Sequence, residues 1–205
     1  MTPQALLARG LQTMSVSLPA PVQATLLAYL ALLEKWNRHY NLTAVRDPQQ
    51  MVPRHLLDSL TVLPFLQGPR VIDVGTGAGL PGIPLALARP DLHFTLLDSN
   101  IKKISFVRQA VVELGLKNAE VAHARAESMA HAAFNTVIAR AFASLSDFVS
   151  VAGALCAPGG RLLAMKGVFP DEELTHVGDN YRIEVKTLTV PGLDAQRHLV
   201  LVEPR

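Results

Sequence analysis

The sequence predicts an α/β fold in which helices cover a mostly parallel sheet of seven strands, with a helical layer at the N-terminus. Helical periodicity dominates up to about residue 69, and from Arg70 onward short apolar runs alternate with helical stretches. That alternation is typical of a parallel sheet with crossover helices. A chain of 205 residues, 49% of them apolar, can bury one core of ordinary size but not two catalytic domains.

The N-terminal segment is expected to form a helical layer over residues 1–69, packed on a catalytic domain at 70–205. Between residues 21 and 40, apolar side chains recur every three or four positions, as in an amphipathic helix: Leu26, Leu30, Leu33, Trp36 and Tyr40. This helix should end near Asn41. Shorter helices are expected at about 2–14 and 48–66, where Pro53 and Pro64 would bound or bend the second one.

Seven strands are expected after residue 69, at 70–74, 94–98, 119–123, 136–140, 161–166, 182–189 and 198–202. Helices are expected between them at about 82–88, 102–114, 145–155 and 170–177. The last two strands are joined around Pro191 and Gly192 by a connection too short for a helical crossover. One of these two strands should therefore run antiparallel to its neighbour.

A glycine-rich loop follows the first strand and carries Gly75, Gly77 and Gly79 before a helix expected to begin at about Pro81. Glycines let the backbone turn tightly and let a ligand approach where a side chain would collide. Residues 77–82 also fit the dinucleotide pattern G-x-G-x-x-G, which alone is a weak signal. The loop by itself therefore leaves a methyl donor and a dinucleotide open.

Two aspartates at strand ends favour S-adenosylmethionine as the ligand. Asp73 would repel a pyrophosphate but can accept hydrogen bonds from the ammonium of a methionine moiety. Asp98, at the end of the second strand, is placed to accept both ribose hydroxyls of either ligand. The alternatives are that Asp73 is a turn residue and that Asp98 and Asn100 cap the next helix. The joint spacing favours a nucleoside site, and with it the Rossmann-like fold of class I S-adenosylmethionine-dependent methyltransferases.

Residue types that are absent from the chain reduce the number of acceptor classes that it could methylate. Methylation of a pyrimidine at C5 needs a cysteine nucleophile, and the single cysteine, Cys156, is expected to be a packing residue. Residues 140–144, after the fourth strand, lack the polar-Pro-Pro-aromatic loop with which amino-group methylases hold an exocyclic nitrogen. An acceptor with a free lone pair, such as guanine N7, needs only in-line positioning. Many small-molecule acceptors would fit equally well.

Composition bears on location and partners. A lone Cys156 and the lack of a secretory signal at the first residues predict a reducing cytoplasm. The longest apolar run, residues 26–33, is about half of what crossing a bilayer requires, so no membrane segment is expected. The net charge of +2 lies within residues 1–69, which hold five Lys and Arg against three acids. The seven histidines show no metal-ligand spacing, so no metal is expected.

Motifs spread over nearly the whole chain occur together in one order, at residues 35–37, 40–43, 54–59, 73–84, 96–99, 140–144, 166–167 and 197–200. With them the chain resembles the bacterial glucose-inhibited division protein B family of 16S ribosomal RNA guanine-N7 methyltransferases. Two mild departures are Ala78, where relatives often have proline, and the pair Asn100 and Ile101, where a glycine is frequent.

The resemblance implies a cytoplasmic, monomeric enzyme that methylates N7 of a guanine in the small-subunit ribosomal RNA near the decoding centre. S-adenosylhomocysteine would be the second product. The cofactor contacts that it implies are Gly75, Leu80, Asp98, Ala126, Glu127 and Arg140. Arg140 could bind the methionine carboxylate or an RNA phosphate, and the bland alternative is a structural salt bridge.

Contacts with RNA are expected from basic side chains, because Lys and Arg supply most sequence-independent affinity. The candidates are Arg54, His55, Lys102, Lys103, Arg108, Lys166, Arg197 and His198. Each could equally be an ordinary surface charge, and Arg54 and His55 could instead cap the helical layer. Phe142 could stack on an extruded guanine or belong to the core.

The leading hypothesis has Asp73, Gly75 and Asp98 hold the methyl donor. Arg140, Lys166 and Arg197 would orient the base and its phosphates. The alternatives are a small-molecule methyltransferase, a dinucleotide-binding oxidoreductase, and a non-catalytic RNA-binding module that uses the same fold.

Overall fold

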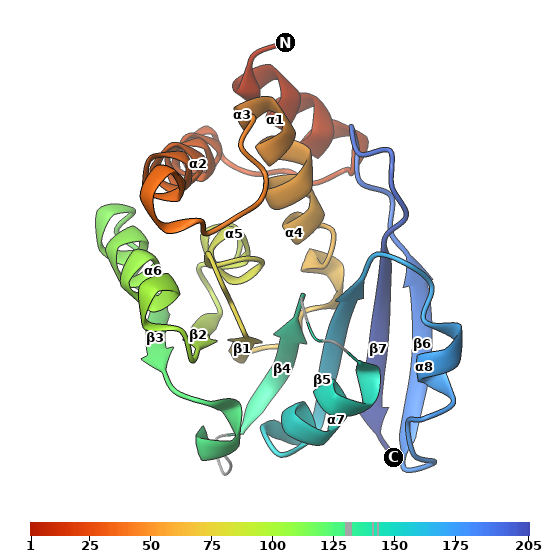
Figure 1. The fold of residues 1–205 in the computed structure, drawn as a ribbon. Helices are drawn as coiled ribbons and strands as arrows, with labels where there is room; N and C mark the ends of the chain where they lie inside the picture. The colour runs from red at the N-terminus through yellow and green to blue at the C-terminus, as the bar shows by residue number, and fades with distance from the viewer. Residues whose placement is uncertain (130–132, 141, 143) are drawn as a thin grey trace.

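The computed structural model describes residues 1–129, 133–140, 142 and 144–205, and its seven strands form a sheet in the order β3-β2-β1-β4-β5-β7-β6 (Figure 1). The strands are β1 Arg70–Val74, β2 His93–Asp98, β3 Ala119–His123, β4 Phe134–Ala139, β5 Cys156–Lys166, β6 Tyr181–Thr187 and β7 His198–Pro204. Strands β1 to β5 run parallel, whereas β7 runs antiparallel to both of its neighbours, β5 and β6. The predicted sheet with one antiparallel strand is confirmed.

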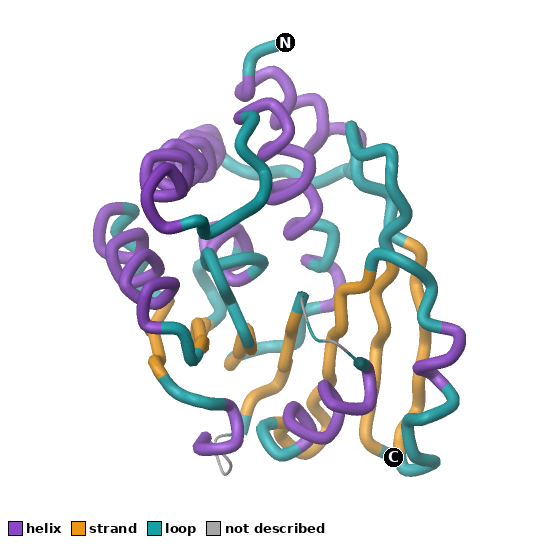
Figure 2. Tube along the Cα trace, in the orientation of Figure 1, coloured by secondary structure: helices purple, strands orange, loops and turns teal. Residues whose placement is uncertain are grey.

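Helices lie on both faces of this sheet (Figures 1 and 2). Their bounds are α1 Pro3–Thr13, α2 Ala20–Tyr40, α3 Pro48–Met51, η1 Val52–Leu57, α4 Asp58–Leu60, η2 Leu63–Phe65, α5 Gly82–Ala88, α6 Ile101–Glu113, η3 Ala126–Met129, α7 Leu145–Gly153 and α8 Asp171–Leu174. One hydrophobic core joins the sheet to α5, α6 and the N-terminal helices. A second core lies on the side of α7 and contains Phe134 and Phe148.

The N-terminal helices share their core with the sheet. Leu7 and Leu33 are fully buried in the same cluster as Val71 of β1. The fully buried Tyr29 of α2 also donates its hydroxyl to the carbonyl oxygen of Ala78, at 2.6 Å. The helical layer therefore packs directly against the loop that follows β1, while a domain division at residue 69 stays a prediction.

The predicted helix at 48–66 is wrong as one continuous element. The chain there forms the short helix α3, the π-helical turn η1, the short helix α4 and the 3₁₀ turn η2. Pro53 has no backbone N–H to give to the carbonyl four residues back, and a wider π turn is one way a helix absorbs such a gap. Pro64 falls within η2. The prolines divide this segment into four short helical elements in place of one continuous helix.

Two later elements also differ from the prediction. The helix expected at 170–177 is limited to α8, where the Thr175 hydroxyl donates to the carbonyl of Glu172 at 2.7 Å and competes with helical bonding. Strand β5 begins at Cys156 rather than at 161. The left-handed Gly159, with a φ of 73°, lets the chain bend there, and the pairing with β4 shifts register between Phe134 and Thr136.

Candidate functional site

The glycine loop leaves the end of β1 and is anchored to the end of β2. The amide groups of Gly75 and Thr76 donate to the carbonyl oxygen of Leu97 at 2.8 and 2.9 Å. Gly75 has a φ of 72°, and a Cβ there would meet no atom within 4 Å. The backbone at Gly75 is thus bent into the left-handed region and open to a ligand, as the sequence predicted for the loop.

Asp73 lies fully buried beneath this loop. Its Oδ2 accepts hydrogen bonds from the hydroxyl of Thr76 at 2.6 Å and from the amide of Gly82 at 2.8 Å. Its Oδ1 has no hydrogen-bond partner in the described part of the chain. Burial raises the pKa of Asp73 to about 6, although the bonds from Thr76 and Gly82 and the charge of Arg140 oppose this shift. An orphaned, buried carboxylate oxygen suits a cationic donor group such as an ammonium.

Asp98 closes the other side of the loop. One carboxylate oxygen, Oδ2, accepts from the amide of Gly77 at 2.9 Å, and Oδ1 accepts from the amide of Asn100 at 2.8 Å. The cap of α6 is Asn100, whose Oδ1 accepts from the amides of Lys102 and Lys103. The alternative in which this segment caps the helix is therefore confirmed for Asn100, while Asp98 bonds to the amides of Gly77 and Asn100 and shapes the loop.

A cavity of about 280 Å³ opens at these strand ends. It is lined by Val74, Gly75, Leu97, Asp98, Ser99, Ala124, Arg125, Ala126, Glu127, Phe142 and Val151. The volume is close to the lower limit of typical small-ligand pockets. We call this space the donor cavity.

Four of the predicted cofactor contacts, Gly75, Asp98, Ala126 and Glu127, line the donor cavity. The others do not lie on its described wall: Asp73, Gly77, Gly79, Leu80 and Arg140. Of these, Leu80 is 2% exposed and belongs to the hydrophobic core. Ser99 and Arg125 were missed by the sequence reasoning, and the signal that could have found them is their position one residue after the end of β2 and two residues after the end of β3.

A second pocket, of about 310 Å³, is rich in positive side chains. It is lined by Val45, Arg54, His55, Asp58, Arg140, Met165, Lys166, Gly167 and Arg197. These residues come from the N-terminal layer, the ends of β4 and β5, and the segment before β7. The structure thus brings together Arg140, Lys166 and Arg197, as the sequence hypothesis required. We call this space the cationic pocket.

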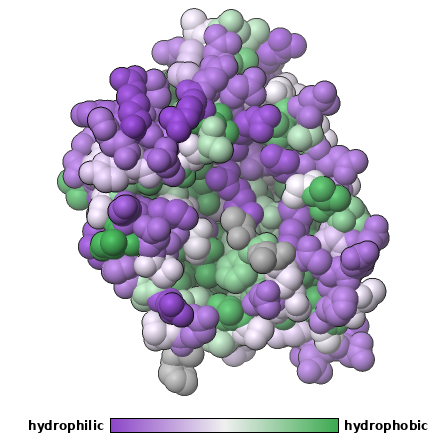
Figure 3. Space-filling model, in the orientation of Figure 1, coloured by the Kyte–Doolittle hydropathy of each residue, from purple (hydrophilic) through white to green (hydrophobic). Residues whose placement is uncertain are grey.

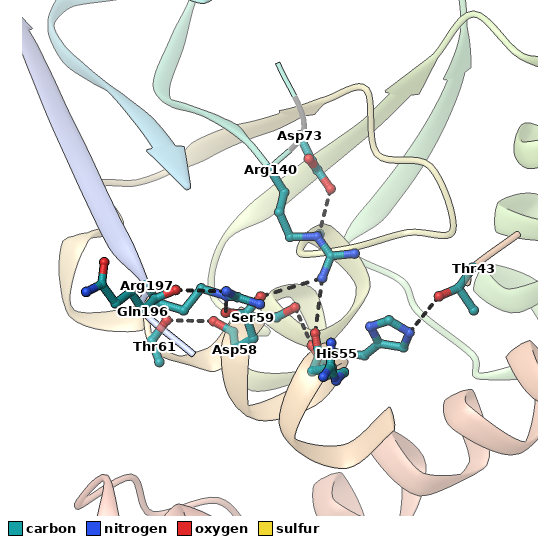
Figure 4. Close-up of polar contacts among 11 residues, drawn as sticks. Thr43, His55, Asp58, Ser59, Thr61, Asp73, Arg140, Gln196 and Arg197 are labelled. Atoms are coloured by element: carbon teal, nitrogen blue, oxygen red, sulfur yellow. Dashed lines mark hydrogen bonds and ion pairs between the residues drawn. The ribbon is translucent and has the colours of Figure 1, made fainter. Parts of the chain in front are cut away.

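Asp58 lines the cationic pocket and was not among the predicted site residues. Its Oδ1 accepts a hydrogen bond from Nε of Arg197 at 3.0 Å, and its Oδ2 lies 3.6 Å from Nη1 of Arg140. Burial raises the pKa of Asp58, while the two guanidinium groups offset part of that rise. Figure 4 shows the guanidinium of Arg140 between Asp73 and Asp58, so this side chain links the cationic pocket to the buried aspartate beneath the glycine loop.

Lys166, at the end of β5, has its ammonium 2.7 Å from Oε2 of Glu173 and donates to the carbonyl oxygen of Phe142 at 3.5 Å. The same Glu173 oxygen accepts from the amide of Leu145. Phe142 therefore touches both spaces, with its carbonyl on Lys166 and its side chain on the donor cavity. Its ring also packs 5.3 Å from that of Phe148, which partly supports the alternative that it belongs to the core.

The two histidines predicted to contact RNA are buried. His55 is 4% exposed, and its Nε2 lies 3.0 Å from the hydroxyl of Thr43. Burial and the nearby Arg140 lower the pKa of His55 to about 4, so its ring is neutral at pH 7. His198 is 6% exposed, with its ring edge-on to Phe169. Both rings are therefore largely shielded from solvent, while His55 still lines the cationic pocket. Contact of either histidine with RNA stays a prediction.

The remaining predicted RNA contacts lie on α6. Lys102 and Arg108 are exposed and Lys103 is half-buried. Neither pocket has any of the three on its described wall. On the face of the molecule in Figure 3, hydrophilic side chains cover the N-terminal helical layer and apolar surface gathers near the centre.

None of the described helices combines the length and apolar character that a bilayer crossing demands. Over residues 1–129, 133–140, 142 and 144–205, no three His, Cys, Asp or Glu side chains form a cluster that could hold a metal ion.

Comparison with solved structures identifies the fold. The chain is similar to a precorrin-6y C5,15-methyltransferase from Geobacter metallireducens, with a TM-score of 0.58 and 14% identity over 80% of this chain and 92% of that one. It is also similar to TrmN from Thermus thermophilus, with a TM-score of 0.59 and 20% identity over 82% of this chain and 53% of that one. The strand order, the glycine loop and these likenesses define the Rossmann-like fold of S-adenosylmethionine-dependent methyltransferases.

Sequence comparison identifies the family. Residues 22–200 match the family model described as GidB, rRNA small subunit methyltransferase G. The chain is 52% identical to the ribosomal RNA small subunit methyltransferase G of Nitrosospira multiformis, over 99% of this chain and 98% of the relative. It is 54% identical to the protein of the same name from Serratia proteamaculans, over 94% and 95%. The chain belongs to the rRNA small subunit methyltransferase G family.

Proposed function

We propose that the protein transfers a methyl group from S-adenosylmethionine to N7 of a guanine in 16S ribosomal RNA, near the decoding centre of the small subunit. The observation that carries this proposal is the pairing of the two spaces at neighbouring strand ends. Strands β1 and β4 are adjacent, and they lead respectively into Gly75 of the donor cavity and Arg140 of the cationic pocket. A nucleoside-sized cavity beside a cluster of cations is what a methyltransferase acting on a nucleic acid requires.

The residues around the donor cavity fit S-adenosylmethionine. Asp98 lines the cavity with a carboxylate that can accept from ribose hydroxyls, and Gly75 presents open backbone. The orphaned Oδ1 of Asp73 suits the methionine ammonium. When bound, the cofactor supplies an activated methyl group on its sulfonium. The roles left to this chain are to bind the donor, to exclude water and to hold the acceptor in line.

The acceptor chemistry fits guanine N7. A free lone pair needs neither a covalent intermediate nor removal of a proton, so positioning can supply most of the acceleration. Cys156 begins β5, whereas Lys166 ends it at the cationic pocket, so the thiol lies at the opposite end of an 11-residue strand. Burial raises the pKa of Cys156, which disfavours a thiolate. These facts support the expectation that Cys156 is a packing residue.

Arg140, Lys166 and Arg197 are proposed to orient the base and the phosphates, with Arg54 adding a further positive charge at the exposed rim. These side chains line one pocket and reach it from different elements. Arg140 is assigned to the acceptor side rather than to the methionine carboxylate, because it lines the cationic pocket. Lys102, Lys103 and Arg108 stay proposed RNA contacts outside both pockets, and Phe142 stays a candidate stacking residue.

Several broader features belong to the same proposal. We expect the enzyme to act on the small subunit or its RNA, since the relatives carry the small subunit in their names. A monomeric state and a cytoplasmic location are further parts of the proposal. The helical segment 1–69 would serve as a layer on the catalytic domain at 70–205, because it provides Arg54 and Asp58 to the cationic pocket.

The direct test is transfer of labelled methyl from S-adenosylmethionine to purified small subunits and to naked 16S RNA, followed by mapping of the modified base. We expect 7-methylguanine at one site. Label on another base would contradict the N7 assignment. Two results would favour the small-molecule alternative: turnover of small molecules without RNA, and a substrate affinity that does not change with salt concentration.

Calorimetry with S-adenosylmethionine and with NAD tests the donor. Binding of the first without the second is expected. Binding of NAD alone would instead support the oxidoreductase reading.

A further inference from the structure

We propose that Asp58 is a positioning residue, which holds the guanidinium groups of Arg140 and Arg197 so that their remaining N–H groups face the RNA acceptor. This inference rests on the proposed function of the cationic pocket. It assigns a role in methyl transfer to the N-terminal helical layer, from which Asp58 comes.

The geometry gives Asp58 one arginine for each carboxylate oxygen. Arg197 contacts Oδ1 through Nε at 3.0 Å, and Arg140 approaches Oδ2 through Nη1 at 3.6 Å. The side chain of Asp58 is 4% exposed, while those of Arg140 and Arg197 are 28% and 23% exposed. The carboxylate is therefore more enclosed than the two guanidinium groups that contact it (Figure 4), and both arginines line the pocket open to a ligand.

Backbone carbonyls complete the fixation of both arginines. Nη1 of Arg140 donates to the carbonyl oxygen of Arg54 at 3.4 Å, and Nη1 of Arg197 donates to that of Gln196 at 2.8 Å. A guanidinium has five N–H donors, so each arginine keeps donors for a base or a phosphate. Because a free arginine side chain loses rotamer entropy when a ligand orders it, holding it in advance lowers the cost of binding in the reactive geometry.

Asp58 is itself held firmly. It begins α4, where its backbone amide is bonded to the carbonyls of Pro53 and His55 in the preceding π-helical turn and its own carbonyl accepts from the hydroxyl of Thr61 at 2.6 Å. Neighbouring Ser59 is fully buried, and its hydroxyl donates to the carbonyl of His55. The short helix thus offers a rigid base from which one carboxylate can fix two long side chains.

The negative charge of Asp58 should weaken the affinity for RNA rather than strengthen it. Its negative charge repels phosphates, so a residue present only for RNA affinity would not be acidic. If Asp58 acts through orientation, removing its charge should slow methyl transfer without weakening RNA binding. A residue with a merely structural role would not produce this separation.

The test is the Asp58→Asn variant, assayed with labelled donor and purified small subunits. The expected result is a kcat about 10- to 100-fold lower, because small misplacements of reacting groups have effects of this size. The KM for subunits should stay the same or fall. Affinity for S-adenosylmethionine, measured by calorimetry, should stay within about twofold. The matched control is Asp91→Asn, which removes the exposed Asp91 from its surface pair with Arg89 and should leave all three values unchanged.

A kcat of Asp58→Asn within twofold of wild type would overturn the positioning role. An equal loss of donor affinity and kcat would also overturn it, because it would indicate a general structural defect. If Asp58→Asn does not fold, Asp58→Glu takes its place. A lowered kcat with intact donor binding would then support the role, and an unchanged kcat would refute it. Wild-type protein that methylates no RNA would overturn the proposed function and this role together, whereas an active wild type isolates the role of Asp58.

Discussion

The donor cavity and the cationic pocket are built by different means. The donor cavity is shaped by backbone turns at the ends of β1 and β2, and its Gly77–Asp98 hydrogen bond joins residues only 21 positions apart. The cationic pocket is shaped by long charged side chains, and its Asp58–Arg197 hydrogen bond spans 139 positions. A site made from local turns follows from a short sequence motif. A site made from side chains depends on the whole packing of the chain.

The largest expected effect concerns the boundary between these sites, at Arg140. The Arg140→Gln variant should lower kcat for methylation of small subunits by about 100-fold, because the base would lose one of its orienting groups. At about pH 8, where loss of the Arg140 charge leaves Asp73 largely ionised, its affinity for S-adenosylmethionine should hardly change, since Arg140 lines the cationic pocket and not the described wall of the donor cavity. Methylation kinetics and calorimetry on the same variant test this prediction. A large loss of donor affinity would instead support the alternative in which Arg140 binds the methionine carboxylate.

Asp98 provides the opposite case, in which donor binding alone should suffer. Asp98→Ala removes the acceptor for the amides of Gly77 and Asn100 and, in the proposed site, for the ribose hydroxyls. We expect S-adenosylmethionine to bind about 1–3 kcal/mol more weakly by calorimetry. RNA binding, followed by filter retention, should be unaffected. Equal losses in both assays would argue that the two sites are not separable.

The difference between the two sites also explains what the sequence could predict. Gly75 and Asp98 sit at strand ends that alternating apolar runs locate, so their meeting could be inferred. Nothing in the sequence indicates that Asp58 would meet Arg140 and Arg197, because that contact depends on how a helix broken at Pro53 packs over the sheet. The burial of His55 could not be predicted from the sequence either, because it depends on the same packing.

The fold was more predictable than the site. The mostly parallel sheet follows from alternating β and α segments, and the short connection at Pro191 indicates that one of the last two strands is antiparallel to its neighbour. The strand order, and the fact that β7 is the reversed strand, come from the structure alone. Element ends were less predictable where side chains compete with the backbone, as at Thr175 after α8. Proline and glycine positions are visible in a sequence, but the turn that each one produces depends on its neighbours in space.

Asp73 should make donor binding depend on pH. Burial raises the pKa of Asp73 to about 6 from an ordinary 3.8, and the carboxylate form is the one that can pair with an ammonium. Roughly one Asp73 in ten is ionised at pH 5 and nine in ten at pH 7, so S-adenosylmethionine should bind about tenfold more weakly at pH 5. His55, with a pKa of about 4, stays neutral across this range. In calorimetry the Asp73→Asn variant should show a flat profile, and an equal slope in both proteins would exclude Asp73 as the cause.

The same shift has a consequence for stability, with a defined sign. Between about pH 4 and pH 6 the native protein keeps the proton on Asp73 while the unfolded chain releases it. The native state then binds more protons, so this group's contribution to the free energy of unfolding falls as the pH rises through that window. Donor binding and stability should therefore change in opposite directions there, which urea titrations at about pH 4 and about pH 6, the two ends of the window, can check against Asp73→Asn.

The smallest expected effect concerns Tyr29, through which the helical layer reaches the donor side. Tyr29→Phe keeps the ring but removes the hydroxyl that donates to the carbonyl of Ala78 at 2.6 Å. Since that hydrogen bond is buried, the free energy of unfolding should fall by about 1–2 kcal/mol in urea titration. Affinity for S-adenosylmethionine should fall only a few-fold, because the bonds of Gly75 and Thr76 to Leu97 still anchor the loop. The comparison variant Tyr40→Phe changes a tyrosine that is 48% exposed and should leave both values unchanged. If the two variants had the same free energy of unfolding and the same affinity for S-adenosylmethionine, the Tyr29 hydrogen bond would not stabilise the glycine loop. The helical layer would then contribute only to the cationic pocket.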